Sequence, residues 1–277
     1  EFRVLLDSNH GAGSLLGRRL LGALGCDVTL LGDEANGQFA HGAEPTADNL
    51  KDVCRRTAEA GVAVGFCQDP DADRLAVIDE AGRYLGEEYT LALCLDHVLR
   101  SNPGSVVTNC SSSRMSADLA AKYGVEYFTS AVGEANVVKA MLAHDAVFGG
   151  EGNGGPIDPR VGHVRDSFVG MALILDAMAA RGLPVSALAD ELPRYEIHKT
   201  KVDLDRDKIP AALAALKSHF ADAQPDEEDG LRLDFSQAWL LVRASNTEPI
   251  VRIIAEAKEL AEAKRLCADA AQVIAGV

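Results

Sequence analysis

Three aspartates at alternate positions form the stretch of this chain with the clearest chemical meaning. Asp69, Asp71 and Asp73 follow the apolar run 62–66 and precede a second apolar run at 75–78. Alternate residues of an extended segment point the same way, so the three carboxylates are expected to converge. Carboxylates held together repel one another, and a divalent cation with oxygen ligands relieves that repulsion. The spacing therefore predicts a Mg2+ site, with a solvated acidic turn between two strands as the simpler alternative.

A calcium-binding EF-hand loop does not fit the same stretch. Asp69, Asp71, Asp73 and Glu80 match its first, third, fifth and twelfth positions. The sixth position, where the sharp turn needs glycine, is Arg74, and both flanking segments are typical of strands rather than helices.

A glycine-rich loop at 149–156 is a second candidate binding element. It follows a predicted strand at 146–148 and carries Glu151 and Asn153, whose polar groups suit sugar hydroxyls. Glycines let a backbone approach a ligand closely, although flexibility alone would also explain them. Ligands of open α/β sheets bind at the carboxyl ends of strands, which favours a binding site here.

A third candidate lies between two predicted strands near the end of the chain. Residues 243–249 combine Arg243 with the hydroxyl or amide side chains of Ser245, Asn246 and Thr247. These donors can surround a phosphate through charge-assisted and neutral hydrogen bonds. A plain hairpin turn is the alternative interpretation.

The elements that must position these loops follow from hydrophobic periodicity and from turn signals. Alternating strands and helices predict an α/β protein with domains at 1–103, 104–190 and 191–277. We expect a helix from Thr46 to Ala60 with Thr46 as its N-cap, and a helix over 167–181 capped by Asp166. Residues 184–195 are expected to form a connection. His163, Arg165 and Asp166 follow the glycine-rich loop closely, and for His163 a surface loop is favoured over a functional role.

A glycine pattern near the start of the chain supports a competing hypothesis. Gly11, Gly13 and Gly17 lie between a predicted strand and helix, and Asp33 follows about twenty residues later. This arrangement resembles the dinucleotide-binding fingerprint of an NAD-dependent oxidoreductase. The spacing is one residue too long for the strict form, so glycines that permit a sharp turn are the favoured explanation.

Composition limits the class of protein and its partners. The 277 residues are 47% hydrophobic and 25% charged, as in ordinary globular proteins, and the net charge of -15 argues against nucleic acid or an anionic membrane as partner. Six scattered cysteines fit reduced thiols in a cytoplasmic protein. No apolar run is long enough to cross a bilayer.

Taken in order, the three polar motifs closely resemble those of the α-D-phosphohexomutase family, which includes phosphoglucomutase, phosphomannomutase and phosphoglucosamine mutase. The resemblance covers the whole chain. It implies family domains two to four, namely two related three-layer α/β domains with mixed sheets and a smaller C-terminal α+β domain.

The resemblance also implies a role for each motif. The acidic loop would bind Mg2+ through Asp69, Asp71 and Asp73, and Arg74 would assist at the phosphate under transfer. The sugar would be held by Glu151, Asn153 and Gly155, the last standing where some members carry histidine. The idle phosphate of a hexose phosphate or hexose bisphosphate would be gripped by Arg243, Ser245, Asn246 and Thr247.

One family element is not found in these residues. The loop that carries the nucleophilic phosphoserine has no counterpart at Ser8 or at 111–113. We therefore expect it on a preceding N-terminal domain, and we expect this chain alone to be inactive. A phosphosugar-binding module without catalysis is the remaining alternative.

Overall fold

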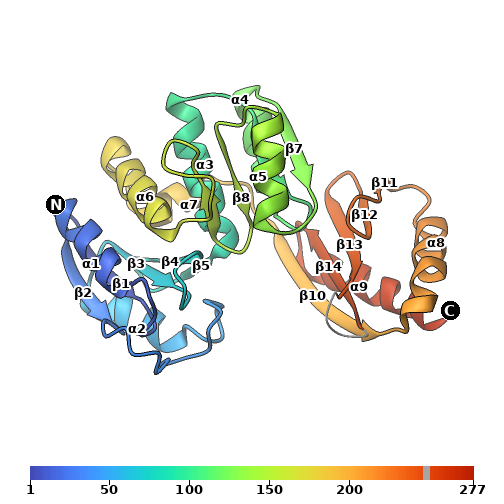
Figure 1. The fold of residues 1–277 in the computed structure, drawn as a ribbon, viewed down its shortest axis with the longest axis horizontal. Coiled ribbons are helices and arrows are strands. Elements are labelled where there is room, and N and C mark those ends of the chain that lie inside the picture. Colours follow the sequence, from blue (N-terminus) through green and yellow to red (C-terminus); the bar gives the residue numbers. More distant parts are fainter. Residues whose placement is uncertain (246–249) are drawn as a thin grey trace. The chain divides into compact units, whose positions relative to one another are not determined.

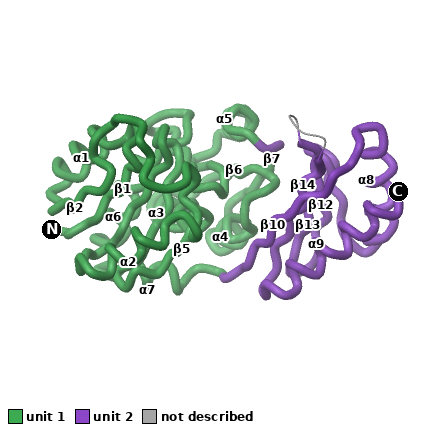
Figure 2. The backbone as a smooth tube through the Cα atoms, turned by 90° about the horizontal axis from the view of Figure 1, so that it is seen from below, with its two compact units in different colours: residues 1–129, 133–193 green, residues 130–132, 194–277 purple. Residues whose placement is uncertain are grey.

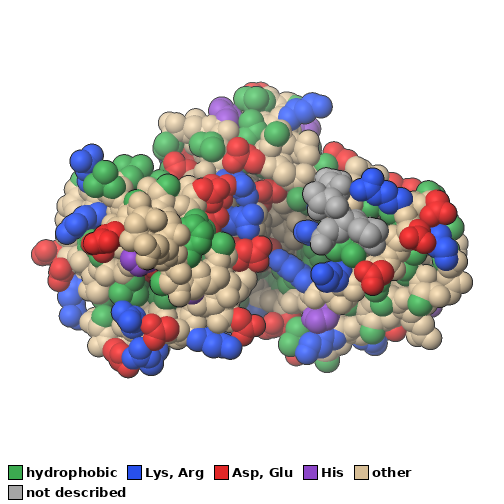
Figure 3. Space-filling view, turned by 60° about the horizontal axis from the view of Figure 1, so that its bottom comes forward, with side chains coloured by type: hydrophobic (Ala, Val, Ile, Leu, Met, Phe, Trp, Pro, Cys, Tyr) green, Lys and Arg blue, Asp and Glu red, His purple; other side chains and the backbone are tan. Residues whose placement is uncertain are grey.

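The computed structural model describes residues 1–245 and 250–277, which form two compact units (Figures 1 and 2). The first unit contains residues 1–129 and 133–193, and the second contains residues 130–132 and 194–277. Acidic and basic side chains are interspersed on the face shown in Figure 3. Within the described residues, no helix has the length and apolar character needed to cross a membrane.

The first sheet of unit 1 has the order β2-β1-β3-β4-β5. β1 pairs in parallel with β2 and β3, whereas the β3–β4 and β4–β5 pairs are antiparallel, so the sheet is mixed as predicted. The strands are β1 (Arg3–Asp7), β2 (Asp27–Leu31), β3 (Val64–Gln68), β4 (Leu75–Asp79) and β5 (Tyr84–Gly86).

Helices α1 (Ser14–Ala23) and α2 (Lys51–Ala60) pack on β1 through its alternate side chains. Leu5 shares a buried cluster with Val53 of α2, while a Cβ built on Gly17 of α1 would lie 2.6 Å from Leu6 Cδ2. Successive strand residues point to opposite faces, so the helices cover opposite faces of the sheet. This arrangement gives the three layers that the sequence predicts.

The predicted helix from Thr46 to Ala60 is wrong at its start, since α2 begins at Lys51. Residues 47–50 instead form a turn in which the Leu50 amide donates to the Thr46 carbonyl at 3.0 Å. The turn inserts the fully buried Leu50 into the core, and this packing outweighs the capping preference of Thr46.

The second sheet of unit 1 has the order β7-β6-β8-β9. β6 and β8 are parallel, and β8 and β9 form an antiparallel pair inside the glycine-rich segment. The strands are β6 (Val106–Asn109), β7 (Tyr127–Ser130), β8 (Phe148–Glu151) and β9 (Gly155–Ile157). The helices that follow β5 in this unit are α3 (Glu87–Ser101), α4 (Met115–Tyr123), α5 (Glu134–Ala143), α6 (Ser167–Arg181) and α7 (Val185–Asp190).

Helix α7 lies within the segment that we expected to be a plain connection. Pro184 stands at its N-cap, and the short helix buries Val185, Leu188 and Ala189. Burial of these apolar side chains stabilises a helix too short to form by propensity alone.

Unit 2 contains one antiparallel sheet with the order β10-β14-β13-β12-β11. Side chains of this sheet share one core with helices α8 and α9. The elements are β10 (Glu196–Asp203), a 3-10 turn (Arg206–Lys208), α8 (Ile209–His219), β11 (Gln224–Asp226), β12 (Leu231–Asp234), β13 (Ala238–Ala244), β14 (Ile250–Ala257) and α9 (Leu260–Ala275). The predicted C-terminal α+β domain is thereby confirmed.

The predicted cap of α6 is present and provides a test of local stability. The Asp166 side chain accepts hydrogen bonds from the amides of Phe168 and Val169 at 2.8 and 3.1 Å. Asp166→Ala should lower the free energy of unfolding by about 1 kcal/mol, as for other N-caps. Asp166→Asn retains an acceptor and serves as the control in denaturant titrations; equal losses in both variants would contradict this role.

Candidate functional site

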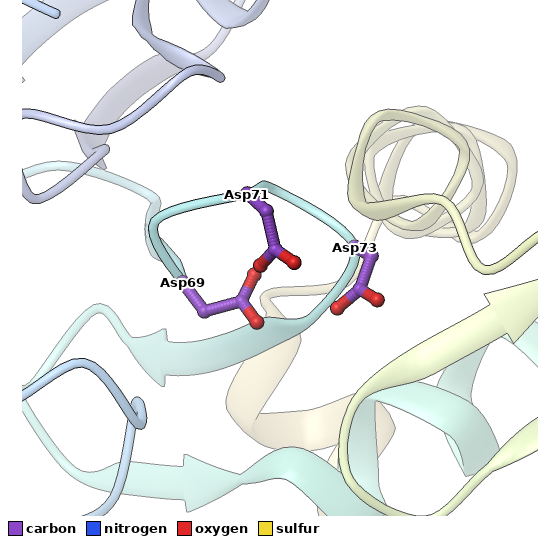
Figure 4. Close-up of side chains that lie close together, drawn as sticks. All are labelled: Asp69, Asp71 and Asp73. Atoms are coloured by element: carbon purple, nitrogen blue, oxygen red, sulfur yellow. The ribbon is translucent and has the colours of Figure 1, made fainter. Parts of the chain in front are cut away.

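The three aspartates converge, but through a turn rather than an extended segment. The loop between β3 and β4 reverses direction at Ala72, which has a φ of 63°, and the Ala72 amide donates to the Asp69 carbonyl at 3.0 Å. One carboxylate oxygen each from Asp69, Asp71 and Asp73 lies within 4.8 Å of the others (Figure 4). The sequence therefore predicted the cluster correctly but gave the wrong backbone geometry, because the antiparallel β3–β4 pairing requires a tight connection.

Burial makes this cluster electrostatically costly in the absence of a cation. The pKa of Asp69 is raised to about 7, mainly by desolvation and also by the charges of Asp73 and Asp71, while a backbone hydrogen bond from Arg74 lowers it. Burial also raises the pKa of Asp73, while Arg165 lowers it. The loop thus concentrates more negative charge than its own surroundings neutralise.

Arg74 lies beside the acids without being fully engaged by them. Its Nε is 3.6 Å from Asp69 Oδ2 and 3.8 Å from Asp73 Oδ1, and this nitrogen has no hydrogen-bond partner. The side chain is 30% exposed. Its guanidinium can therefore turn towards an anion that approaches the acidic loop.

The glycines at positions 11 and 13 pack closely against the acidic loop and the end of β3. The Ala12 amide donates to the Pro70 carbonyl at 2.7 Å, and a Cβ on Gly11 would lie 2.3 Å from that same oxygen. A Cβ on Gly13 would lie 2.5 Å from Gln68 Oε1. Close packing against the acidic loop accounts for these glycines without a dinucleotide.

The glycine-rich segment contacts the acidic loop within unit 1. The Leu75 amide, which follows Arg74, donates to the Gly154 carbonyl at 2.8 Å. Gly154 has a φ of 84°, and a Cβ there would lie 2.3 Å from the Leu75 carbonyl oxygen. The backbone of the candidate sugar loop is therefore held against the exit of the candidate metal loop.

Glu151 and Asn153 have different surroundings in this segment. Glu151 is buried, and its Oε1 accepts from Asn109 Nδ2 at 2.6 Å and from the Gly133 amide at 2.9 Å. Asn153 Oδ1 is buried without a hydrogen-bond partner, so it can accept a hydrogen bond from a ligand. A hydroxyl that binds Glu151 would share its Oε2 with Arg165, which lies 3.0 Å away.

Gly155, the third predicted sugar residue, lies in β9 against the stem of Arg165. A Cβ at Gly155 would lie 2.4 Å from Arg165 Cδ. His163, for which a surface loop is predicted, is exposed, whereas the Arg165 side chain is only 15% exposed. Arg165 directly precedes the Asp166 cap of α6 and follows a glycine-rich segment. This position is the local sequence feature that could have indicated its burial.

The candidate phosphate loop lies in unit 2, between β13 and β14. Arg243 pairs through its Nε and Nη2 with the two oxygens of Asp229, each at 3.2 Å, and the Ser245 amide donates to the Ile250 carbonyl at 2.9 Å. Arg252 is directly opposite Arg243 in the antiparallel register and is exposed. The predicted contributors Asn246 and Thr247 lie outside the described residues.

Comparison with known proteins agrees with this fold. Models for α/β/α domain II, α/β/α domain III and the C-terminal domain of phosphoglucomutase/phosphomannomutase match residues 1–82, 87–195 and 200–273. The chain belongs to the phosphoglucomutase/phosphomannomutase family. The first two matches divide after residue 82, before α3, whereas we expected a boundary after residue 103.

Individual relatives include phosphoglucomutase/phosphomannomutase of Thermococcus kodakarensis, which is 40% identical over 94% of this chain and 58% of its own length. A probable phosphoglucosamine mutase of Thermococcus gammatolerans is 33% identical over 99% of this chain and 62% of its own. A phosphoglucomutase/phosphomannomutase family protein of Burkholderia thailandensis has a similar structure, with a TM-score of 0.85, 26% identity and coverage of 98% and 60%. This chain therefore spans about three fifths of the length of these relatives.

The raised pKa of Asp69 predicts a pH-dependent stability in the presence of a chelator. Between the ordinary value of 3.8 and about 7, the folded chain keeps a proton that the unfolded chain has lost. Stability should therefore fall as pH rises through this window. The Arg74 amide donates to Asp69 Oδ1 at 3.0 Å, and Asp69→Asn keeps an acceptor for this hydrogen bond. The substitution should raise the free energy of unfolding at pH 8 by about 1–3 kcal/mol, since one pKa unit corresponds to about 1.4 kcal/mol.

Denaturant titrations followed by circular dichroism from pH 4 to 8 measure this effect. Asp207→Asn, an exposed position in unit 2, is the control and should not change the pH dependence. If the free energy of unfolding depends on pH in Asp69→Asn as it does in the parent, the ionised Asp69 carboxylate does not destabilise the fold.

Proposed function

We propose that this chain carries the metal, sugar and phosphate sites of a phosphohexomutase. The enzyme would move a phosphoryl group between C1 and C6 of a hexose or hexosamine phosphate. The observation that supports this most directly is the convergence of the Asp69, Asp71 and Asp73 oxygens within 4.8 Å in a member of this family. A phosphosugar-binding module that does not catalyse is the alternative, and turnover distinguishes the two.

The acidic loop has the donor chemistry that Mg2+ prefers. Its candidate ligands are carboxylate oxygens, and Asp73 Oδ1 is buried without a hydrogen-bond partner. When bound, Mg2+ would neutralise charge on the phosphoryl group under transfer. Arg74, which is close to both Asp69 and Asp73, would hold an oxygen of that group by a charge-assisted hydrogen bond.

The other two loops would orient the sugar. Asn153 offers a buried, unpaired amide oxygen to a hydroxyl, and Glu151 would accept a second hydroxyl beside Arg165. Gly155 would serve the sugar site by leaving room for the stem of Arg165 beside Glu151. Arg243 and Ser245, together with Asn246 and Thr247, would hold the phosphate that does not react. Such fixed positioning lowers the entropic part of the barrier.

The phosphoryl donor of this reaction would be a phosphoserine supplied by an N-terminal domain outside these 277 residues, and its serine hydroxyl would be the nucleophile of the return step. It would transfer its phosphoryl group to the sugar hydroxyl, giving a hexose bisphosphate and a free serine. After the bisphosphate reorients in the site, the serine would accept the other phosphoryl group. Domains 1–103, 104–190 and 191–277 would supply the rest of the site.

The phosphate role of Arg243 can be measured by binding. Arg243→Ala should weaken the binding of a hexose phosphate by about 1.5–3 kcal/mol, the contribution of a hydrogen bond to a charged group. Calorimetry with glucose 6-phosphate tests this, with Arg206→Ala, an exposed arginine outside the loop, as control. Equal affinity in the Arg243 variant and the parent would rule out the assignment.

The need for an external nucleophile can be measured by turnover. With a hexose 1-phosphate, hexose 1,6-bisphosphate and Mg2+, the 277-residue chain should show no mutase activity, because the phosphoserine of this proposal would lie on the N-terminal domain. Addition of a phosphorylated N-terminal domain from a relative should produce turnover, and Asp71→Ala should abolish it. Robust turnover by the chain alone that is lost in Asp71→Ala would place the nucleophile within these residues.

A further inference from the structure

Arg165 contacts three acidic residues from different parts of unit 1, although His163 and Val164, which precede it, are exposed. It belongs to the connection between β9 and α6, and its side chain is 15% exposed. The absence of a side chain at Gly155 makes room for its stem, because a Cβ there would lie 2.4 Å from Arg165 Cδ. A cationic side chain that is largely buried is stable only if nearby groups compensate its charge.

That compensation comes from three carboxylates on three different elements. Arg165 Nη2 donates to Asp73 Oδ2 of the acidic loop, and Nη1 is 3.0 Å from Glu151 Oε2 at the end of β8. Nε is 3.3 Å from Glu134 Oε2 at the start of α5, and this oxygen also accepts from the Arg165 amide at 2.9 Å. Each nitrogen of the guanidinium thus faces a different acid.

The contact with Asp73 determines how that carboxylate is presented. Arg165 occupies Oδ2, whereas Oδ1 is buried without a hydrogen-bond partner and has Arg74 Nε at 3.8 Å. A carboxylate held by one oxygen cannot turn freely, so its other oxygen keeps a fixed direction. Groups that orient a metal ligand in this way typically change metal affinity 10–100-fold when they are altered.

We propose that Arg165 is a positioning residue that couples the metal loop to the sugar loop. It holds Asp73 through Oδ2 so that Oδ1 faces the metal site, and it holds Glu151 with the same guanidinium. The proposal rests on the proposed function of the acidic loop as a Mg2+ site. It adds that the geometry of metal site and sugar loop depends on one side chain.

A test must separate the geometry of Arg165 from its charge. Removal of the positive charge would by itself favour a cation nearby, so a neutral variant would mix two opposite effects. Arg165→Lys keeps the charge, but a single ammonium cannot present a planar fork to three carboxylates. Arg160→Lys is the matched control: Arg160 lies in the same connection and pairs with the buried Asp158 instead.

The measurement is Mn2+ binding to the 277-residue chain, followed by the electron paramagnetic resonance signal of free Mn2+ and by calorimetry. Arg165→Lys should weaken Mn2+ binding about tenfold. Arg160→Lys should leave it unchanged. Asp71→Asn reports on the metal site itself and should remove most of the binding.

Coupling to the sugar loop is tested by introducing Glu151→Gln both into the parent chain and into the Arg165→Lys variant. The contacts of Glu151 are with Asn109, Gly133 and Arg165, so it reaches Asp73 through the guanidinium. Glu151→Gln should weaken Mn2+ binding in the parent, because Arg165 loses one anchor, and should have little effect when Arg165 is already lysine. Non-additivity of this kind measures the coupling.

The outcomes separate this inference from the proposed function. If the parent binds Mn2+, Asp71→Asn abolishes binding and Arg165→Lys binds as well as the parent or better, the metal site stands and the role of Arg165 is overturned. Equal effects of Glu151→Gln in both backgrounds would overturn the coupling. If the parent does not bind Mn2+, or Asp71→Asn does not reduce binding, the proposed metal site fails and the role of Arg165 fails with it.

Discussion

Repulsion among the carboxylates of Asp69, Asp71 and Asp73 is the constraint on which the organisation of unit 1 depends. Three oxygens within 4.8 Å, partly withdrawn from water, favour protonation or a cation over three free charges. Such a cluster persists only on a backbone that cannot open. The fully buried strands β3 and β4 supply that backbone, since every residue of both strands is inside the core.

The surrounding loops are built against this rigid turn. Gly11 lets the first strand-to-helix connection approach the Pro70 carbonyl, and Gly154 lets the β8–β9 segment accept the Leu75 amide. In both places a side chain would collide with backbone, so the glycines are required by close approach rather than by flexibility. Arg165 completes the arrangement with charge, because it is shared between the acidic loop and Glu151.

In unit 2 the largely buried charge belongs to an arginine side chain, and a nearby carboxylate compensates it. The Arg243 side chain is only 17% exposed and is already paired with Asp229, so a phosphate would compete with an internal carboxylate for the guanidinium. The pairing keeps the fork ordered before a ligand binds, at the cost of some affinity. Exposed Arg252, opposite it in the sheet, can add positive charge on the same face.

Much of this could be predicted because local patterns encode it. Helix α6 matches its predicted range of 167–181, and strand β4 covers the apolar run at 75–78, since hydrophobic periodicity and the Asp166 cap act within a few residues. The acidic triplet likewise lies in five consecutive residues, 69–73. Three features were decided only by tertiary packing: the late start of α2, which follows from burial of Leu50; the pairing of Arg243 with Asp229; and the place of Arg165. Arg165 is 92 residues from Asp73, and no local pattern records which acid a distant arginine will meet, because that contact exists only when the loop before α6 packs against the turn after β3.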